Sequence, residues 1–438
     1  MARLKNLFGP AVLMAAGLGV VGVAGYGFIG LTGHTLPAAD AAALASLYLL
    51  VNIIGPGLFV ALEQETSRAT SARLAVGGEL RPVVRHALLH GLIMLVAVLA
   101  LLGAISPVLT ARALGGQWGL FAAVVLSVVT SAGVYLVRGL LGGRQRFHGY
   151  AATLGVEGIA RLLPCAVIAV SGPDGVLYAL AFAAGSGFGA LAGLPGLRAR
   201  TVVDVHLPGE GGRGGDPEAS TFASMGRGLL LLVVGTLLMQ LVANLAPIVV
   251  TSRLVSDPAT AQAFASAFVL VRVPLFLFAP VQAMLLPGIT RAATTGDTAT
   301  VWARLRLVLL AVAGIGVPAA VLSFTVGPLA ARLFFGAEVD LAGAVVGLLG
   351  VGTIALMVAQ VLQPGLVAFG SHRYVTAAWV LGTVVLVGLL FLPGDPLRAA
   401  IAAQLAASVA VVAVMSVGLF RAIRGATRAT PPAVAVGG

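Results

Sequence analysis

The chain has 438 residues, of which 59% are hydrophobic and only 9% are charged, and its formal net charge is +11. An ordinary soluble domain carries about 25% charged residues, so this composition excludes a soluble fold and indicates lipid as the solvent. The single cysteine excludes an internal disulfide framework, and the arginines fall at the ends of apolar runs, which argues against a nucleic-acid-binding patch.

Apolar runs of about 20 residues are long enough to span a membrane as helices. The first run, Phe8–Leu31, follows the basic start at Met1–Lys5 and is longer than the apolar core of a typical signal peptide, so we interpret it as a retained span. The sequence predicts an all-α polytopic membrane protein with twelve transmembrane helices. The remaining predicted spans are Ala41–Leu62, Val84–Ile105, Trp118–Leu141, Ala151–Val170, Gly175–Leu197, Gly228–Val250, Ala261–Leu286, Leu305–Val326, Leu341–Leu366, Val375–Leu392 and Ala399–Phe420.

A polar, glycine-rich stretch at 198–227 separates the sixth predicted span from the seventh. Its Glu210–Gly215 portion has the composition of a flexible linker. We therefore expect an N-terminal six-helix lobe at 1–197, a cytoplasmic linker at 198–227, a C-terminal six-helix lobe at 228–420 and a cytoplasmic tail at 421–438.

The distribution of basic residues predicts the orientation of the chain. When both termini are placed in the cytoplasm, most of the 26 lysines and arginines fall in inside segments, Arg138 among them. This asymmetry is typical of proteins inserted with their basic loops inside, and it supports twelve spans with cytoplasmic N- and C-termini. The outside loops then hold Arg112, Arg253, Arg332 and Arg398.

A hydrophobic pattern repeats along the chain with an offset of 220 residues, so that Ala45–Gly116 matches Ala265–Gly336. At one end of the repeat Ala45-Ser46 aligns with Ala265-Ser266, and at the other end Gly116 aligns with Gly336. With an even number of spans per half, the copies have the same orientation. Parallel repeats of this kind are typical of carriers whose halves rock about a central site.

Three ionisable residues stand out within the predicted spans. Glu157 and Arg161 are four apart on the fifth span, so they can pair, and Arg272 lies near the middle of the eighth span, where the first copy has Asn52. One interpretation is a central cavity in which Arg272 and Arg161 face an anionic substrate. The alternative is that Glu157 and Arg161 neutralise each other and that Arg272 caps a broken helix. Two arginines against one glutamate predict a net positive charge in the membrane.

Uncharged polar groups add weaker candidates for the same cavity. Gln240 and Asn244 share a face of the seventh span, although interhelical hydrogen bonds worth about 0.6 kcal/mol each explain such residues equally well. Prolines within the spans, such as Pro56 and Pro274, predict bends that suit a carrier but also occur in static helices.

Other motifs have structural interpretations. His86 and His90 share a helix face, but further metal ligands are not evident, so we interpret them as interface histidines. No nucleophile–base pair or phosphate-binding loop is recognisable, so we expect no enzymatic activity, metal or cofactor. Three glycines form a small-xxx-small ridge that predicts close helix packing, namely Gly185, Gly189 and Gly193.

Two patches of sequence carry a resemblance to a known family. They are the run from Phe268 to Arg291 (Arg-x-Pro-Leu-Phe, then Gln-Ala-x-Leu-Leu-Pro-x-x-Thr-Arg) and the run from Arg138 to Phe147 followed by Glu157 and Arg161. These patches resemble the multidrug/oligosaccharidyl-lipid/polysaccharide (MOP) flippase superfamily, and in particular its Wzx-type polysaccharide biosynthesis and export proteins. The resemblance implies a MATE-like fold in the bacterial plasma membrane, with a V-shaped cavity between two lobes, alternating access, and coupling to ion or voltage gradients.

The resemblance also implies a cargo and partners. The cargo would be a lipid-linked (polyprenyl-pyrophosphate) oligosaccharide or polysaccharide precursor, with membrane lipids, glycosyltransferases or a polymerase as further partners and no nucleic acid. Net positive intramembrane charge suits a pyrophosphate, and Phe8–Leu31 lacks the acid that drug-exporting relatives carry in their first span. A MATE-type multidrug or cation antiporter and a non-transporting membrane scaffold of glycan synthesis remain as alternatives. The candidate substrate-binding residues are Arg272, Arg161, Glu157, Asn52, Gln240 and Asn244.

Overall fold

The computed structural model describes residues 2–198, 222–275, 298–369 and 371–429. Helices account for most of these residues, and no strand occurs among them. Twelve of the described segments are long and apolar enough to cross a membrane. The all-helical fold class and the twelve predicted spans are therefore confirmed, and the chain is a multi-pass membrane protein. In hydrocarbon every backbone polar group must be bonded internally, which is why such apolar segments form continuous helices.

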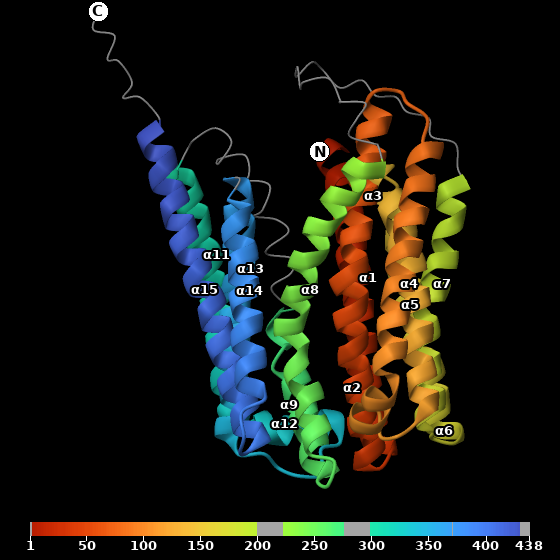
Figure 1. Ribbon diagram of the computed structural model, residues 1–438, viewed down its shortest axis with the longest axis vertical. Coiled ribbons are helices and arrows are strands. Elements are labelled where there is room, and N and C mark those ends of the chain that lie inside the picture. Colours follow the sequence, from red (N-terminus) through yellow and green to blue (C-terminus); the bar gives the residue numbers. More distant parts are fainter. Residues whose placement is uncertain (1, 199–221, 276–297, 370, 430–438) are drawn as a thin grey trace, which may run out of the picture. The chain divides into compact units, whose positions relative to one another are not determined.

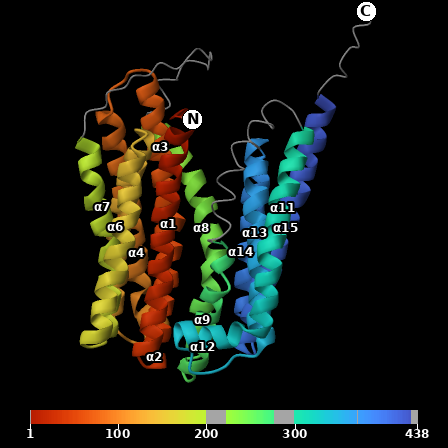
Figure 2. The ribbon, with the colours of Figure 1, turned by 180° about the vertical axis from the view of Figure 1, so that it is seen from behind.

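Most of the helices are long (Figures 1 and 2). In the first half they are α1 (Ala2–Thr35), α2 (Ala38–Ile54), the π-helical turn η1 (Gly55–Phe59), α3 (Val60–Ala75), α4 (Arg81–Ala113), α5 (Trp118–Gly143), α6 (Phe147–Ser171) and α7 (Gly175–Arg198). In the second half they are α8 (Phe222–Arg253), α9 (Pro258–Leu270), α11 (Thr298–Thr325), α12 (Gly327–Phe335), α13 (Gly343–Ala368), α14 (His372–Leu390) and α15 (Pro396–Ala429).

Contacts between residues divide the chain into two compact units. Unit 1 comprises Met1–Ala265 together with Phe334–Glu338, and unit 2 comprises Ser266–Leu333 and Val339–Gly438. Helix α8 belongs to unit 1, where it contacts α2, α3 and α4. The division into lobes at 198–227 stays a prediction based on the repeat and the linker composition.

Within unit 1, α6 packs along α1 on one side and α7 on the other, and α7 packs along α5. An aromatic cluster forms part of its core, with the ring centroids of Phe28 and Phe182 4.5 Å apart and Tyr48 beside both. Helix α4 is the least buried of the described spans and exposes a continuous series of leucine, isoleucine and valine side chains. Such a surface is suited to lipid contact. Unit 1 therefore has an interior that holds polar groups and a lipid-facing exterior.

Unit 2 contains a bundle of four long helices, α11, α13, α14 and α15, in which α13 contacts the other three (Figure 2). Trp379 of α14 is 1% exposed and donates its indole N–H to Gln363 of α13 over 3.0 Å. The buried indole therefore has a hydrogen-bond partner.

The 220-residue repeat is visible in backbone conformation. Gly116 and Gly336, which the repeat aligns, have φ angles of +76° and +63°. Glycine is the residue that adopts this left-handed conformation without a steric penalty. The copies differ just before this point, because α4 continues to Ala113 whereas α11 ends at Thr325 and α12 begins at Gly327. Gly327 is followed by Pro328, and this pair disfavours a continuous helix.

Candidate functional site

The buried carboxylate of Glu157 on α6 is the centre of a charged network inside unit 1. Arg161, one turn along the same helix, places Nη2 2.6 Å from Oε1 of Glu157, so the predicted pair is confirmed. Arg138 of α5 donates to the other carboxylate oxygen, and Ser186 of α7 donates to Oε1 over 2.7 Å. Glu157 is only 4% exposed, so donors from three helices take the place of water around its charge.

The two arginines of this network have further partners. Arg138 is 5% exposed and donates through Nε to the hydroxyl of Thr153 over 2.9 Å. Arg161 donates to Ser186 over 2.7 Å, and its guanidinium carbon lies 4.5 Å from the centre of the Phe182 ring. An arginine over an aromatic face gains electrostatic stabilisation, most of all where water is excluded. Both arginines are thus held in the interior of unit 1.

The glycine ridge of α7 makes this network possible. A Cβ atom at Gly185 would lie 2.3 Å from Cγ of Arg161, and one at Gly189 would lie 3.0 Å from Cβ of Glu157. The predicted close packing of α6 against this ridge is therefore confirmed. Larger side chains would separate the helices and remove Ser186 from the carboxylate.

A second carboxylate lies beside the network. Tyr150, in the first turn of α6, donates its hydroxyl to Oε1 of Glu63 on α3 over 2.5 Å. A Cβ atom at Gly139 of α5 would lie 2.8 Å from the backbone oxygen of Glu63, so this glycine allows α3 to approach. The guanidinium carbon of Arg138 lies 5.9 Å from the centre of the Tyr150 ring, which links Glu63 to the same interior region.

These contacts add two residues to the predicted set of charges within the spans. The sequence predicted two arginines within the spans, Arg161 and Arg272, against Glu157 alone, and it grouped Arg138 with the cytoplasmic segments. The structure buries Arg138 within α5 and adds Glu63, so two arginines and two glutamates meet in unit 1. Arg161 is directed to Glu157 and α7, which favours the interpretation of this pair as structural. This network is neutral by itself. The second arginine of the predicted count, Arg272, lies in unit 2, so the predicted excess of positive charge stays a prediction.

Asn52, Gln240 and Asn244 form a second polar group, between α2 and α8. Pro56, in η1, has no N–H to donate to the backbone oxygen of Asn52. Gln240 fills this place by donating Nε2 to that oxygen over 3.1 Å, and Asn244 donates to the backbone oxygen of Gln240 over 3.2 Å. One turn away, Thr236 donates to the backbone oxygen of Gly57 over 2.6 Å. These contacts are interhelical and helix-internal hydrogen bonds, the alternative that the sequence left open.

Arg272 lies in unit 2, at the end of α9. The helix ends at Leu270, and turn-type hydrogen bonds follow, from the Arg272 N–H to the Val269 oxygen over 3.1 Å and from the Leu275 N–H to the Arg272 oxygen over 3.0 Å. The guanidinium carbon of Arg272 lies 4.1 Å from the centre of the Phe268 ring. The helix break predicted near Pro274 is therefore confirmed as far as Leu275. The rest of the predicted eighth span, with the Gln-Ala-x-Leu-Leu-Pro motif, lies outside the described residues.

The two histidines of α4 lie against the first turn of α8. The ring centroids of His90 and Phe222 are 4.1 Å apart in a stacked arrangement, and those of His86 and Phe222 are 5.8 Å apart. A Cβ atom at Gly226 would lie 3.0 Å from Nε2 of His90, so a small residue is needed there. Both histidines serve a helix interface, as predicted.

Sequence reasoning missed several members of the buried network, although some signals were present. Arg138 lies inside the predicted span Trp118–Leu141 and was nevertheless grouped with the loop residues. Glu63 and Tyr150 each lie one residue beyond a predicted span boundary, and the observed helices include both. Ser186 and Thr153 carried no signal of their own, because small hydroxyl residues are common in membrane helices.

Comparison with solved structures defines the class of fold. The chain has the fold of the MATE transporters of the MOP superfamily. No protein-family model matches the sequence, and no curated protein matches it.

Three solved structures illustrate this likeness. An inward-facing multidrug resistance MATE family transporter of the MOP superfamily is similar with a TM-score of 0.73 and 16% identity, over 94% of this chain and 96% of that one. An outward-facing structure of such a transporter gives a TM-score of 0.62 at 16% identity, over 96% and 97% of the chains. A MOP superfamily transporter from Pyrococcus furiosus, described as having a binding pocket of reverse polarity that suggests a different function, gives 0.62 at 14% identity, over 95% of both chains.

Proposed function

We propose that this chain is a membrane transporter that moves an anionic lipid-linked saccharide, such as a polyprenyl-pyrophosphate oligosaccharide or polysaccharide precursor. The observation that carries the proposal is the position of Arg272. It lies near the middle of the predicted span Ala261–Leu286, of which the structure describes the part up to Leu275. The described acidic residues of this unit, Asp340 and Asp395, lie in loops outside the spans.

The chemistry of Arg272 suits a pyrophosphate. An arginine presents a planar fork of N–H donors that binds phosphate oxygens in pairs, and it keeps its charge in a membrane. The break after Leu270 places Arg272 in a turn, where turn-type hydrogen bonds replace those of the regular helix. Irregular backbone at membrane depth is typical of substrate sites in carriers.

The acidic residues argue against a cation as the substrate. In the described spans of unit 1, every buried or half-buried carboxylate has a side-chain partner: Asp40 binds Gln117, Glu63 binds Tyr150, Glu65 binds Arg68, and Glu157 binds two arginines. A multidrug or cation antiporter needs a carboxylate that is available to a cation. The Pyrococcus furiosus transporter, with its pocket of reverse polarity, is an example of this fold in a protein for which a different function has been suggested.

The proposal is tested by transport in proteoliposomes. The purified chain is reconstituted with a fluorescent polyprenyl-pyrophosphate saccharide, and a membrane-impermeant quencher reports how much label crosses the bilayer. We expect Arg272→Ala to reduce the rate at least tenfold and Arg272→Lys to restore part of it. Arg398→Ala is the matched control, because Arg398 belongs to the same unit and its side chain is 90% exposed.

Each other result has a defined meaning. Equal transport by the parent chain and by Arg272→Ala, at equal protein content, would refute the role of Arg272. Uptake of a cationic dye without movement of the labelled lipid would favour the antiporter. Binding of the labelled lipid without movement would favour a scaffold of glycan synthesis.

A further inference from the structure

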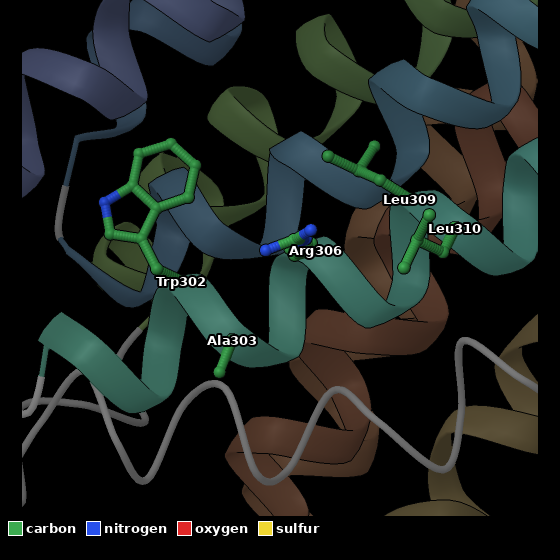
Figure 3. A pocket seen from close by; sticks show the side chains of 5 residues that line it. All are labelled: Trp302, Ala303, Arg306, Leu309 and Leu310. Carbon is green, nitrogen blue, oxygen red and sulfur yellow. The ribbon is translucent and has the colours of Figure 1, made fainter.

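A groove on the surface of α11 combines one cationic side chain with apolar walls. It has a volume of about 430 Å³ and is lined by Trp302, Ala303, Arg306, Leu309 and Leu310 (Figure 3). All five residues belong to α11, near the start of the span in unit 2. The described residues that line the groove thus include neither Arg272 nor a member of the buried network of unit 1.

The order of the side chains along α11 follows the layers of a lipid leaflet. Trp302, Arg306 and Leu310 are four residues apart, so they share one face of the helix. Figure 3 shows the indole, the guanidinium and the leucine side chains in this order along the helix. Each four-residue step advances roughly 6 Å. An indole at the headgroup level, a cation beside the phosphate and leucines beside the acyl chains are the usual order at a membrane boundary.

The face of α11 beyond the groove is suited to lipid and not to water. Its exposed large side chains include Leu307, Val317, Val321 and Leu322, and the first hydroxyl after Arg306 belongs to Ser323. A helix that lined an aqueous passage would carry polar side chains along this length. An acyl chain can lie along this surface without exposing apolar area to water.

The charge of the groove favours an anionic headgroup. Within the described part of unit 2, Arg332 pairs with Asp340 at 3.1 Å and Arg398 with Asp395 at 3.4 Å, whereas Arg306 has no ion pair. The arginines at the same helix ends, Arg373 and Arg424, lie over the aromatic rings of Tyr374 and Phe420. This end of unit 2 thus presents cations and aromatic rings together, a combination that suits lipid phosphates.

We propose that the groove of Trp302, Arg306, Leu309 and Leu310 is a binding site for an anionic phospholipid of the surrounding bilayer. Arg306 binds the phosphate and acidic headgroup, Trp302 packs beside the glycerol region, and the two leucines contact an acyl chain. The predicted orientation of α11 places this lipid in the cytoplasmic leaflet. None of its described lining residues is among the candidate substrate-binding residues, and its occupant is not the transported saccharide.

The tryptophan content of the chain allows a direct test. The chain has three tryptophans, of which Trp379 is 1% exposed and Trp118 lies at the start of α5. In a Trp118→Phe background, the fluorescence that lipids can quench comes from Trp302. The full chain is reconstituted in phosphatidylcholine with increasing fractions of brominated phosphatidylglycerol or, separately, brominated phosphatidylcholine. We expect the anionic lipid to quench at about fivefold lower mole fraction, the effect of one arginine near an anionic lipid.

Matched variants decide the result. Arg306→Gln should remove the preference, whereas Arg304→Gln should keep it, because Arg304 is two residues away on another face of α11 and does not line the groove. Trp302→Phe, which should abolish the quenching, verifies the source of the signal. Each variant is checked for a monodisperse elution profile before reconstitution. Equal quenching by both lipids, or equal loss of preference in Arg306→Gln and Arg304→Gln, would overturn the proposal.

Discussion

Arg138 of α5 and Glu157 of α6, 19 residues apart in the sequence, form an ion pair in which both side chains are only 5% exposed. The pair connects two helices through the interior of unit 1 and shares its carboxylate with Arg161. Such a pair does not by itself show that a protein is stable, because burying charges is costly. The pair instead favours one arrangement of α5, α6 and α7, because any other packing of these helices would leave a buried charge without a partner.

Removing the carboxylate should therefore be severe. In Glu157→Gln, Arg138 and Arg161 lose their shared counter-charge, and we expect a loss of about 3–5 kcal/mol of stability. The measurement is the apparent melting temperature of the purified protein in detergent. Glu79→Gln serves as the control, because Glu79 is exposed after the end of α3 and should leave the melting temperature unchanged. Similar melting temperatures for the two variants would contradict the role of Glu157.

The glycine ridge of α7 should be sensitive at one position in particular. In Gly185→Ala, the new methyl group would lie 2.3 Å from Cγ of Arg161, so α6 and α7 must move apart, at a cost of about 1–3 kcal/mol. Gly155→Ala on α6 is the comparison, since nothing lies within 4 Å of a Cβ there. It should be neutral or slightly stabilising. The apparent melting temperatures of the two variants are compared in detergent. An unchanged melting temperature for Gly185→Ala would show that α6 and α7 are less closely packed than described.

The repeat offers a paired experiment at its last residue. Gly116→Ala should cost about 1–2 kcal/mol from the left-handed backbone alone, because no atom lies within 4 Å of the added methyl group. Gly336→Ala carries the same backbone penalty and also brings the methyl group within 2.3 Å of the Gly33 oxygen. We expect Gly336→Ala to express poorly or melt at a clearly lower temperature. Equal behaviour of the two variants would argue against the contact with Gly33.

One side-chain hydrogen bond from Gln240 links α8 to the backbone of α2. In Gln240→Leu, the backbone oxygen of Asn52 loses its donor, and Pro56 cannot replace it. We expect destabilisation of about 1 kcal/mol, within the range measured for polar contacts between membrane helices. Gln64→Leu, at an exposed position of α3, is the control. If transport changed while stability did not, Gln240 would instead belong among the substrate-binding residues.

The sequence predicted the helical architecture well because lipid imposes a simple rule: each span must be apolar and about 20 residues long. It placed Glu157, Arg161 and Arg272 correctly as charges within spans. It could not predict that Arg138 turns inward, since an arginine three residues from the end of an apolar run reaches water as easily as a buried partner. The arrangement of the charged network depends on α7, whose glycines set the distance to α6 and whose Ser186 binds Glu157. That distance depends on which helices become neighbours, and hydropathy does not encode it.

The position of α8 in unit 1 has a consequence for chains cut between 199 and 221. Such a cut separates α1–α7 from α8, yet α8 contacts α2, α3 and α4 and is tied to α2 by Gln240. Residues 2–198 and 222–429, produced as separate polypeptides, should therefore associate without a covalent link and elute together when only one carries an affinity tag. The protein is therefore a candidate for a split reporter. Its two fragments would be expressed from separate genes, and their association through unit 1 would be followed in the membrane of a living cell.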